Sequence, residues 1–286
     1  MIMRTVIGWF DAAAVCGGVE QRRIDWLRVV PFLALHLACF AVAWVEASAA
    51  AVWTAIALFA LRMFAITAFY HRYFSHRAFA TSRAAQFVFA VLGASAVQRG
   101  PLWWASHHRH HHAHADEAAD SHSAKQHGFA WSHAGWFLSP ANFPTRTERV
   151  ADLARYPELR WLDRFDVAVP AVLAIALLAF GVEFFVWGFC VSTVALYHAT
   201  FTINSLAHRF GTRRFETRDD SRNNWWLALL TFGEGWHNNH HRYPGAARQG
   251  FRWWEVDLSY YGLRLLAALG LVWDLRPVPA QLRGGA

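Results

Sequence analysis

The sequence is poor in charged residues and has almost no lysine. Charged side chains make up 16% of the 286 residues, against 55% for hydrophobic ones. An intrinsically disordered chain is excluded, because such chains are rich in charge and poor in apolar residues. A soluble domain with a fully wetted surface would also need more polar side chains than these. We therefore expect a protein that faces lipid over part of its surface.

Lys125 is the only lysine, so the net charge of +7 comes almost entirely from arginine. The arginines stand beside hydrophobic runs and form no single basic module, which argues against a nucleic-acid-binding protein. Cysteine is also scarce, and Cys16, Cys39 and Cys190 are far apart and odd in number. They match neither a disulfide framework nor a C-x-x-C metal site. We expect buried, unreactive thiols.

Long apolar runs are present instead, and four of them are candidate membrane spans. About 20 residues cross a hydrocarbon core of about 30 Å at a helical rise of about 1.5 Å per residue. The third run is short and would need flanking residues to complete the crossing. We predict an all-α integral membrane fold with four transmembrane helices in two hairpins, with a soluble all-helical protein as the alternative. The four runs are residues 29–48, 49–70, 167–182 and 184–203.

Arginine placement predicts the orientation of these spans. Arginines precede the first span and follow the second and the fourth, whereas the two hairpin tips have neither arginine nor lysine. The positive-inside rule then places both termini and the long central loop in the cytoplasm. The expected organisation is a cytoplasmic segment (1–28), one domain (29–275) with a helical cytoplasmic cap (71–166 and 204–275), and a tail (276–286).

Three other segments are apolar but are not expected to span a membrane. Residues 84–97 and 260–273 are too short for a span and should form interfacial or buried helices. The N-terminal residues are not expected to be a cleavable signal, because Arg4 and Asp11 interrupt their apolar character.

Histidine is abundant, with 17 residues, and most of these lie in three clusters. The first is HRYFSH at 71–76, whose two histidines would differ by about 140° around an α-helix and so need not bind the same metal. The second, at 107–114, contains histidines at i, i+3 and i+4 in two registers, 107/110/111 and 108/111/112. The third has this spacing without ambiguity, at 237, 240 and 241. Three histidines at this spacing share one helical face.

Chance does not account for this pattern. From composition alone, the triplet should occur roughly 0.06 times in a chain with this many histidines, yet two separate segments contain it. A solvated histidine run could explain the second cluster but not the third. Imidazole ligands suit zinc, copper, iron or nickel, and no cysteine lies nearby to close a structural zinc site. Eight or more histidines exceed the ligands that one ion can use, so we predict two metal ions.

The same residues resemble the histidine boxes of membrane fatty acyl desaturases, most closely a bacterial form of the acyl-CoA Δ9 (stearoyl-CoA type) branch. The matching segments include HRYFSH at 71–76, HRHHH at 108–112 and HNNHH at 237–241. The resemblance selects the second register and adds a histidine from NSLAH at 204–208, in which Asn204 is expected to hold a metal-bound water. The implied ligands are His71, His76, His108, His111, His112, His208, His237, His240 and His241.

The family implies a diiron centre that uses O2 and two electrons from a separate carrier, such as a ferredoxin, a cytochrome b5-like protein or a reductase. It removes hydrogens from two adjacent methylenes of a saturated acyl chain and leaves a cis double bond. Zinc is a plausible substitute for iron on expression. The implied location is a bacterial cytoplasmic membrane, with the metal site on the cytoplasmic side.

One difference from the pattern of animal acyl-CoA desaturases leaves two candidates for the group that carries the acyl chain. Animal acyl-CoA desaturases have a basic pair soon after the Gly-Trp of the GFxxSHxGW stretch, where it helps to hold the CoA phosphates. Here Gly135-Trp136 is followed by Phe-Leu-Ser-Pro. The substrate is therefore expected to be either acyl-CoA or an acyl group on a membrane lipid.

A saturated acyl chain has no polar group near its reacting carbon, so selectivity for one position along it must come from the length and bend of a tunnel. We expect Ala55 and Phe59, three to four turns before His71, to cap its far end. Trp104, Thr200 and Phe201 are candidate wall residues, with simple core packing as the alternative for all five.

Two other functions are compatible with the same histidines. A membrane fatty acid or alkane hydroxylase would share the metal site, and a metal transporter or sensor would use the same ligands differently. The acids available to orient ligand imidazoles are Asp116, Asp120, Glu234 and Asp257.

Overall fold

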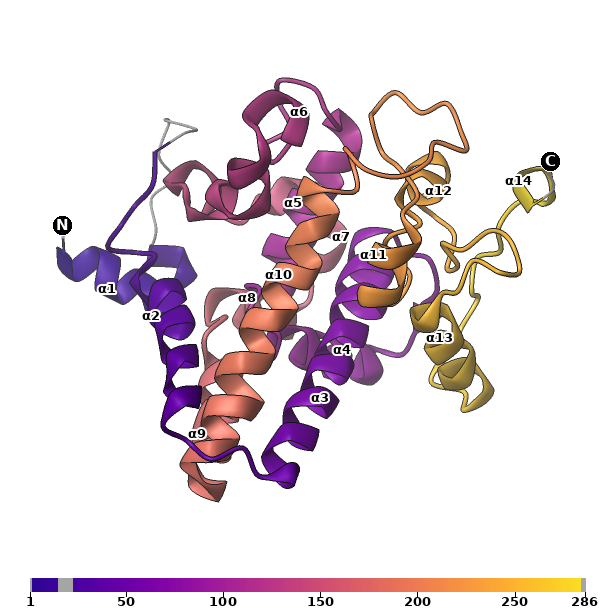
Figure 1. Cartoon of the computed structure of the whole chain (residues 1–286). Coiled ribbons are helices and arrows are strands. Elements are labelled where there is room, and N and C mark those ends of the chain that lie inside the picture. Colours follow the sequence, from indigo (N-terminus) through magenta and orange to yellow (C-terminus); the bar gives the residue numbers. More distant parts are fainter. Residues whose placement is uncertain (1, 15–22, 284–286) are drawn as a thin grey trace.

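The computed structural model describes residues 2–14 and 23–283, so Cys16 lies outside the described residues. Its regular elements are helices apart from one two-residue pairing of β1 (Ala80–Thr81) with β2 (Val272–Trp273), and two isolated β-bridges join Asn223 to Thr212 and Trp236. The helices that make the long bundle are α2 (Val30–Ala38), η2 (Cys39–Ala43), α3 (Ala49–Phe64), η3 (Ala65–Ser75), α9 (Ala168–Phe180), η8 (Phe184–Val191) and α10 (Ser192–Ser205). They run side by side toward the lower end of the molecule in Figure 1.

Two of the four predicted spans have the length and apolar character to cross a membrane: Ala49–Ser75 and Phe184–Ser205. The other two are shorter than predicted, because the helices cover only Val30–Ala43 and Ala168–Phe180. Local interactions explain where α3 begins and where α9 ends. The Ser48 side chain caps α3 by accepting the N–H of Ala51 at 3.2 Å, and Gly181, at φ 145°, ends α9 before η8 begins.

Close packing holds the bundle together. Gly188 on η8 faces the side chain of Thr54 on α3 and that of Leu177 on α9, and a methyl group there would already be in tight contact with Thr54. On the outer side, large apolar residues are exposed, including Trp53, Val172 and Phe180. Exposed apolar side chains over helices of this kind fit a surface that faces lipid.

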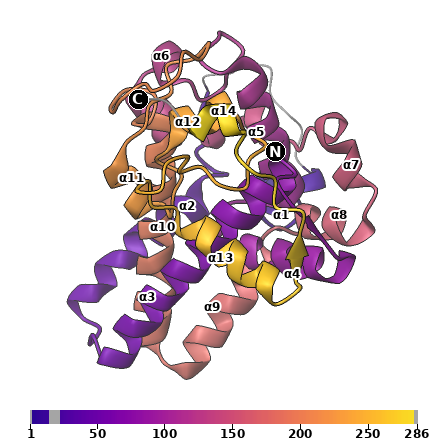
Figure 2. The same cartoon turned by 90° about the vertical axis from the view of Figure 1, so that its right-hand side faces the viewer.

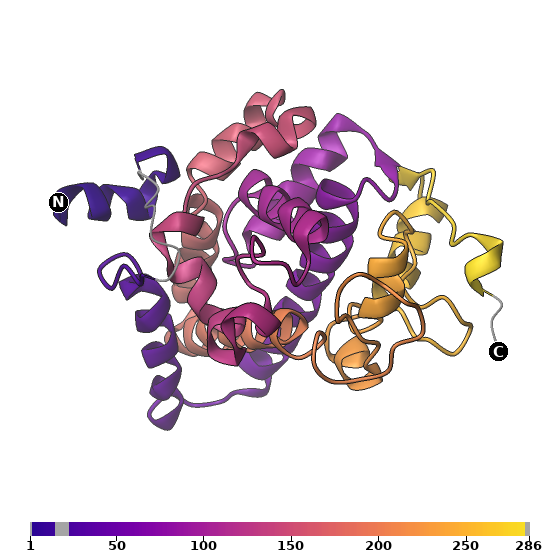
Figure 3. The same ribbon diagram turned by 90° about the horizontal axis from the view of Figure 1, so that it is seen from above.

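The remaining helices form a cap around the upper part of the bundle. Figure 3, seen from above, places the described chain ends at opposite edges of this cap. Its elements are α1 (Ile2–Phe10), η1 (Ala12–Ala14), α4 (Arg83–Ala94), α5 (Pro101–His114), α6 (Ala124–His127), η4 (Trp131–Gly135), η5 (Trp136–Leu138), η6 (Pro140–Asn142), η7 (Thr147–Val150), α7 (Ala151–Ala154), α8 (Pro157–Arg164), α11 (Trp225–Leu230), α12 (His237–Arg242), α13 (Leu258–Ala268) and α14 (Ala280–Arg283).

The helix predicted within 260–273 is α13, which lies on the flank of the bundle (Figure 2). Gly262 lets it approach, since a Cβ there would overlap the ring of Phe64. Its outward face exposes Leu258, Leu265 and Leu269. One buried face and one exposed apolar face agree with an interfacial helix.

Three histidines outside the metal boxes form a hydrogen-bonded chain between helices. His36 Nε2 lies 3.2 Å from His198 Nε2, and His198 Nδ1 lies 3.0 Å from His133 Nε2. The His133 Nδ1 atom is 2.9 Å from Ser205 Oγ, and the His36 Nδ1 atom is 2.8 Å from the carbonyl oxygen of Phe32. This imidazole chain connects α2, α10 and η4.

Candidate metal centre

The nine histidines predicted as ligands come from four parts of the chain that meet at the upper end of the bundle (Figure 1). The elements are η3 with its C-cap, α5, the turn that follows α10, and α12. The structure brings all nine together and divides them into two groups. These are His71, His76, His108, His112 and His240 in the first group, and His111, His208, His237 and His241 in the second.

The first histidine box owes its geometry to a π-helix. The backbone N–H of His76 donates to the carbonyl of His71 at 3.2 Å, and this i→i+5 bond defines the π-helical turn. The wider turn places the two rings on the same side, with their centroids 4.9 Å apart. Both histidines therefore lie in the first group, although α-helical spacing alone left that open.

In the first group, five ring nitrogens lie within 4.8 Å of one another. His71 Nε2 is 3.0 Å from His240 Nε2, which is itself 2.9 Å from His112 Nε2. The Nε2 atoms of His76 and His108 are 2.8 Å apart. All five nitrogens thus converge on one small volume.

The second group has four ring nitrogens within the same limit of 4.8 Å. The Nε2 atoms of His208 and His237 are 3.0 Å apart. The two groups are neighbours, because the rings of His112 and His241 stack with centroids 4.5 Å apart. Two adjacent ions could therefore be held by nitrogen ligands.

The alternative register of the second box includes His107 and His110, whose rings bond to backbone carbonyls. His107 Nε2 lies 3.3 Å from the carbonyl oxygen of Pro144, and His110 Nε2 lies 2.8 Å from that of Ala119. Neither belongs to a histidine group among the described residues. Only His111 is common to both registers.

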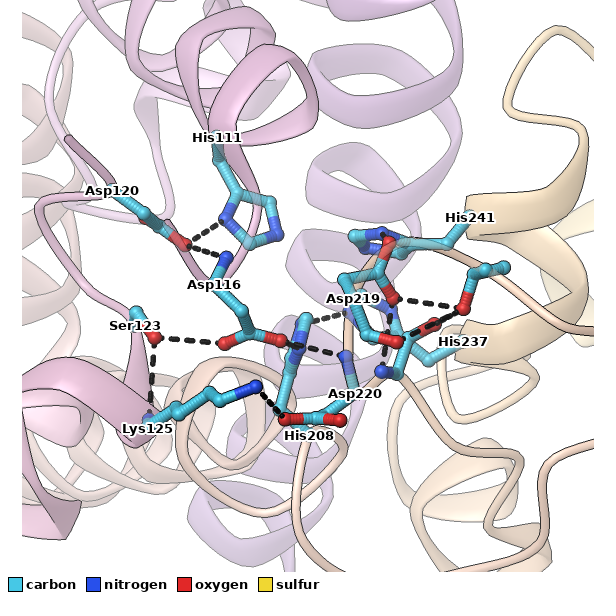
Figure 4. Close-up of polar contacts among 12 residues, drawn as sticks. His111, Asp116, Asp120, Ser123, Lys125, His208, Asp219, Asp220, His237 and His241 are labelled. Atoms are coloured by element: carbon cyan, nitrogen blue, oxygen red, sulfur yellow. Dashed lines mark hydrogen bonds and ion pairs between the residues drawn. The ribbon is translucent and has the colours of Figure 1, made fainter. Parts of the chain in front are cut away.

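Carboxylates orient four of the nine rings. Figure 4 shows three of them: Asp120 beside His111, Asp116 beside His208 and Asp219 beside His241. The distances from Nδ1 to the carboxylate oxygen are 2.9, 2.8 and 3.0 Å, in that order. The fourth pair is His71 with Glu234.

These contacts fix where each imidazole carries its hydrogen. An ionised carboxylate only accepts, so the Nδ1 atom must donate, and the Nε2 atom is left with a lone pair that faces the group. Burial raises the pKa of Asp116 and Asp219, but hydrogen bonds from His208 and His241 outweigh it and hold both values well below the usual range. The carboxylates are therefore ionised at neutral pH.

Glu234 links the centre to a buried ion network. Its other oxygen lies 3.1 Å from Arg72, whose guanidinium also pairs with Asp257 at 2.9 Å. Asp257 accepts the N–H groups of Gln249 and Tyr260, at 2.7 and 2.9 Å. Asp257 therefore supports Arg72 and the start of α13 and touches no ligand imidazole, whereas the other three predicted acids do.

The nitrogens fit a metal centre on their own geometry. His240 Nε2 has two other Nε2 atoms within 3.0 Å, yet a ring nitrogen carries at most one hydrogen. The Nδ1 atoms of His237 and His240 and the Nε2 atom of His241 are buried without a hydrogen-bond partner. Buried polar atoms are rarely left unpaired. Cations bound at the converging nitrogens would resolve the crowding at His240 Nε2 and would give His241 Nε2 a partner, whereas the Nδ1 atoms of His237 and His240 lie on the other side of their rings. An all-imidazole donor set suits iron or zinc.

A cavity of about 300 Å³ reaches the centre, and His71, His108 and His237 form part of its wall. Trp104, Thr200, Phe201 and Asn204 also line it, and the cavity does not include Ala55 or Phe59. The Trp104 ring stacks on His108 at 4.9 Å, and Thr200 accepts a hydrogen bond from Gln98 at 2.9 Å.

Two features of this site were not anticipated from the sequence. Asp219 lies in a loop without a recognised motif, and only folding brings it to His241. Gln98, which precedes α5, lines the cavity and donates to Thr200. An amide beside an apolar helix usually needs a partner, but this does not identify the partner. No pattern in the sequence marks either residue.

Comparison with known proteins agrees with this geometry. The fatty acid desaturase profile matches residues 47–272. The chain is 39% identical over 261 residues to an sn-1 stearoyl-lipid 9-desaturase of Anabaena variabilis, covering 89% of this chain and 94% of that protein. It is 37% identical over 281 residues to an acyl-CoA 5-desaturase of Anemone leveillei, covering 92% and 85%.

A helical bundle with two histidine groups beside a largely apolar cavity fits a metal-binding protein of the membrane type. The chain belongs to the fatty acid desaturase family, and it is a fatty acyl desaturase.

Proposed function

We propose that this desaturase introduces a cis double bond at the Δ9 position of a saturated acyl chain carried by a membrane glycerolipid. Support for the position and the carrier comes from the stearoyl-lipid 9-desaturase that covers 89% of the chain. The stretch after Trp136 adds to it, because Phe137 and Leu138, which line the cavity, stand near where animal acyl-CoA enzymes have a basic pair. Acyl-CoA is the second candidate, favoured by the acyl-CoA 5-desaturase relative.

The nine grouped histidines are proposed to bind two irons, with Asn204 holding a metal-bound water. Bound there, the irons would supply the oxidation: O2, two electrons and two protons combine with two hydrogens from adjacent methylenes, and two waters form. The electrons would come from a separate carrier protein. The chain's own residues fix the tautomer of four ligands and line the cavity with mostly apolar side chains, which is the usual division of work with a cofactor.

The cavity is proposed to hold the acyl chain. Trp104 packs on His108 and lies 6.0 Å from the ring of His71, so a chain against this indole passes beside the first group. Thr200 and Phe201 form the facing wall from α10. Ala55 and Phe59, further along α3, remain the predicted far end for long chains.

The membrane arrangement is also a proposal. We infer four spans, in which the shorter helices Val30–Ala43 and Ala168–Phe180 are completed by flanking residues, and a cytoplasmic metal centre. Arginine placement supports this orientation, and the exposed apolar side chains of the bundle support its place in the membrane.

The observation that carries the proposed function is the apolar cavity that ends against both groups of converging imidazoles. Its test is expression of the chain in a bacterial host, with gas chromatography–mass spectrometry of the host's lipids and metal analysis of the purified protein. We expect a new cis-9 monounsaturated chain and two irons per chain, with the product absent in a His240→Ala variant. A hydroxylated chain would instead show a hydroxylase, and metal uptake without any lipid product would show a transporter.

A further inference from the structure

Two arginines line the cavity at the junction of the cap and the bundle. Arg28 precedes α2, and Arg99 precedes α5. Trp9 and Gly8 of α1 line the same cavity, as does Asp166, which precedes α9. This junction differs from the rest of the cavity wall, which is largely apolar outside the metal centre.

The two arginines are not equivalent. Arg99 is neutralised by Asp166, whose carboxylate lies 2.7 Å from its Nε, and it also donates to the carbonyl of Phe143 at 3.1 Å. The Arg28 guanidinium has no carboxylate or carbonyl partner among the described residues and lies over the ring of Phe143, 4.4 Å from its centroid. Two acids lie nearby: Asp25 accepts the backbone N–H of Arg28 at 3.1 Å, and Asp166, whose carboxylate pairs with Arg99, acts on the Arg28 charge without a direct bond.

The charge of Arg28 is nevertheless retained. Burial and the nearby charge of Arg99 lower the pKa of Arg28 to about 10, so it stays protonated at neutral pH. A half-buried guanidinium whose five N–H donors bond no carboxylate or carbonyl of the described residues is unusual, because burying a charge without a direct partner is costly. The charged residues that line the cavity at this junction are Arg28, Arg99 and Asp166, so this part of the lining has a net charge of about +1.

We propose that Arg28 binds a phosphate group of the acyl donor and so anchors the donor's head while its chain extends toward the histidines. The inference rests on the proposed function and specifies the class of substrate: a phosphate-bearing donor in preference to a neutral one. Guanidinium matches phosphate by paired hydrogen bonds. Trp9 of α1, which lines the same junction, would close over the ester end of the chain.

Phosphate occurs in two acyl donors, and the position of Arg28 favours one. In a glycerophospholipid the phosphate is only a few bonds from the acyl ester, so one cavity can contain both. In acyl-CoA the long pantetheine arm separates the phosphates from the thioester. Because Arg28 lines the same cavity as His71 and His108, the short separation fits better.

The test compares ligands that share one chain and differ in the head. Native mass spectrometry of the full-length protein would measure retention of 1-stearoyl lysophosphatidate, 1-stearoylglycerol and stearoyl-CoA in competition. The variants are Arg28→Gln, Arg28→Lys, and Arg160→Gln as a matched control on the exposed face of α8, away from the cavity. Circular dichroism and metal content would confirm that each variant is folded.

We expect the wild type to prefer lysophosphatidate to stearoylglycerol. Arg28→Gln should lower lysophosphatidate retention by about tenfold, the value of a hydrogen bond to a charged group, and leave stearoylglycerol unchanged. Arg28→Lys should restore part of the preference, and Arg160→Gln should match the wild type. A loss confined to stearoyl-CoA would identify CoA as the source of the phosphate.

Two results would overturn the inference: an unchanged preference in Arg28→Gln, or an equal loss of all three ligands, which would mean that Arg28 only supports the fold. Because retention is measured without turnover, the outcome is separate from the proposed function. A wild type that binds phosphate ligands through Arg28 but makes no double bond would refute the Δ9 desaturation proposal alone.

Discussion

Asp116 offers a direct test of how carboxylates hold the second histidine group. Its Oδ2 accepts from His208 Nδ1 and from the N–H of Asp220, both at 2.8 Å, and its Oδ1 accepts from Ser123 Oγ at 2.7 Å. An Asp116→Asn substitution can keep the two contacts at Oδ2, from His208 and Asp220, but loses the one with Ser123, whose hydroxyl already accepts two backbone N–H groups of α6. Its backbone, at φ 62°, also tolerates asparagine. The change therefore removes the charge and the hydrogen bond from Ser123 and keeps the two bonds at the oxygen that faces His208.

The expected loss of metal affinity follows from the removal of that charge. Hydrogen bonds to charged groups contribute about 1.5–3 kcal/mol, against about 0.5–1.5 kcal/mol for neutral pairs. Asp116→Asn should thus weaken the support of His208 by about 1–1.5 kcal/mol, or about tenfold in metal affinity. Asp116→Gly, which the backbone also tolerates, removes every contact and should cost about 100-fold, the upper range for groups that orient metal ligands.

The assay is metal content per chain after dialysis against increasing chelator. One of the two ions should be lost first, at about tenfold less chelator in Asp116→Asn than in the wild type. Asp220→Asn is the control, since that carboxylate pairs only with partly exposed cations such as Lys125, at 2.9 Å, and surface pairs contribute little. If Asp116→Gly retained both ions as firmly as Asp220→Asn, the proposed role of the carboxylate would be wrong.

Three further outcomes are expected. His237→Ala should abolish desaturation without preventing membrane insertion, as measured by product analysis and membrane fractionation. Phe59→Ala should shift the products toward longer acyl chains, and an unchanged profile would remove its role at the far end. Burial raises the pKa of Asp163 to about 6 from 3.8, so the stability that its neutral form gives below pH 4 is lost as the pH rises through 6. The melting temperature should fall less over this range in Asp163→Asn.

The histidine sites were accessible from the sequence because their spacing is local. Triplets at i, i+3 and i+4 report a helical face directly, so the third box could be assigned before any fold was known. The second box was ambiguous between two helical faces, and only the resemblance selected one. For His71 and His76 an α-helical period left open whether they bind the same metal, because a π-helical turn changes the angle between residues five apart.

Contacts between distant segments were harder to predict. Asp219 meets His241, and Arg72 joins Glu234 to Asp257, only because separate loops close over the bundle. The first and third spans were predicted too long for a related reason. Apolar composition continues past the points where their helices end, and composition alone does not mark a helix end.

The imidazole chain of His36, His198 and His133 has a direction. The carbonyl of Phe32 can only accept, so His36 Nδ1 must hold a hydrogen, and a neutral His36 then accepts at Nε2. His198 then donates from Nε2 and accepts at Nδ1 from His133 Nε2. The Nδ1 atom of His133 faces the hydroxyl of Ser205, which also lies 3.1 Å from the carbonyl oxygen of Phe201. One backbone oxygen thereby sets the tautomers of three side chains from three segments, and their dipoles align head to tail. Replacing His198 with leucine, which can neither donate nor accept, would interrupt that order at its middle and leave two independent halves.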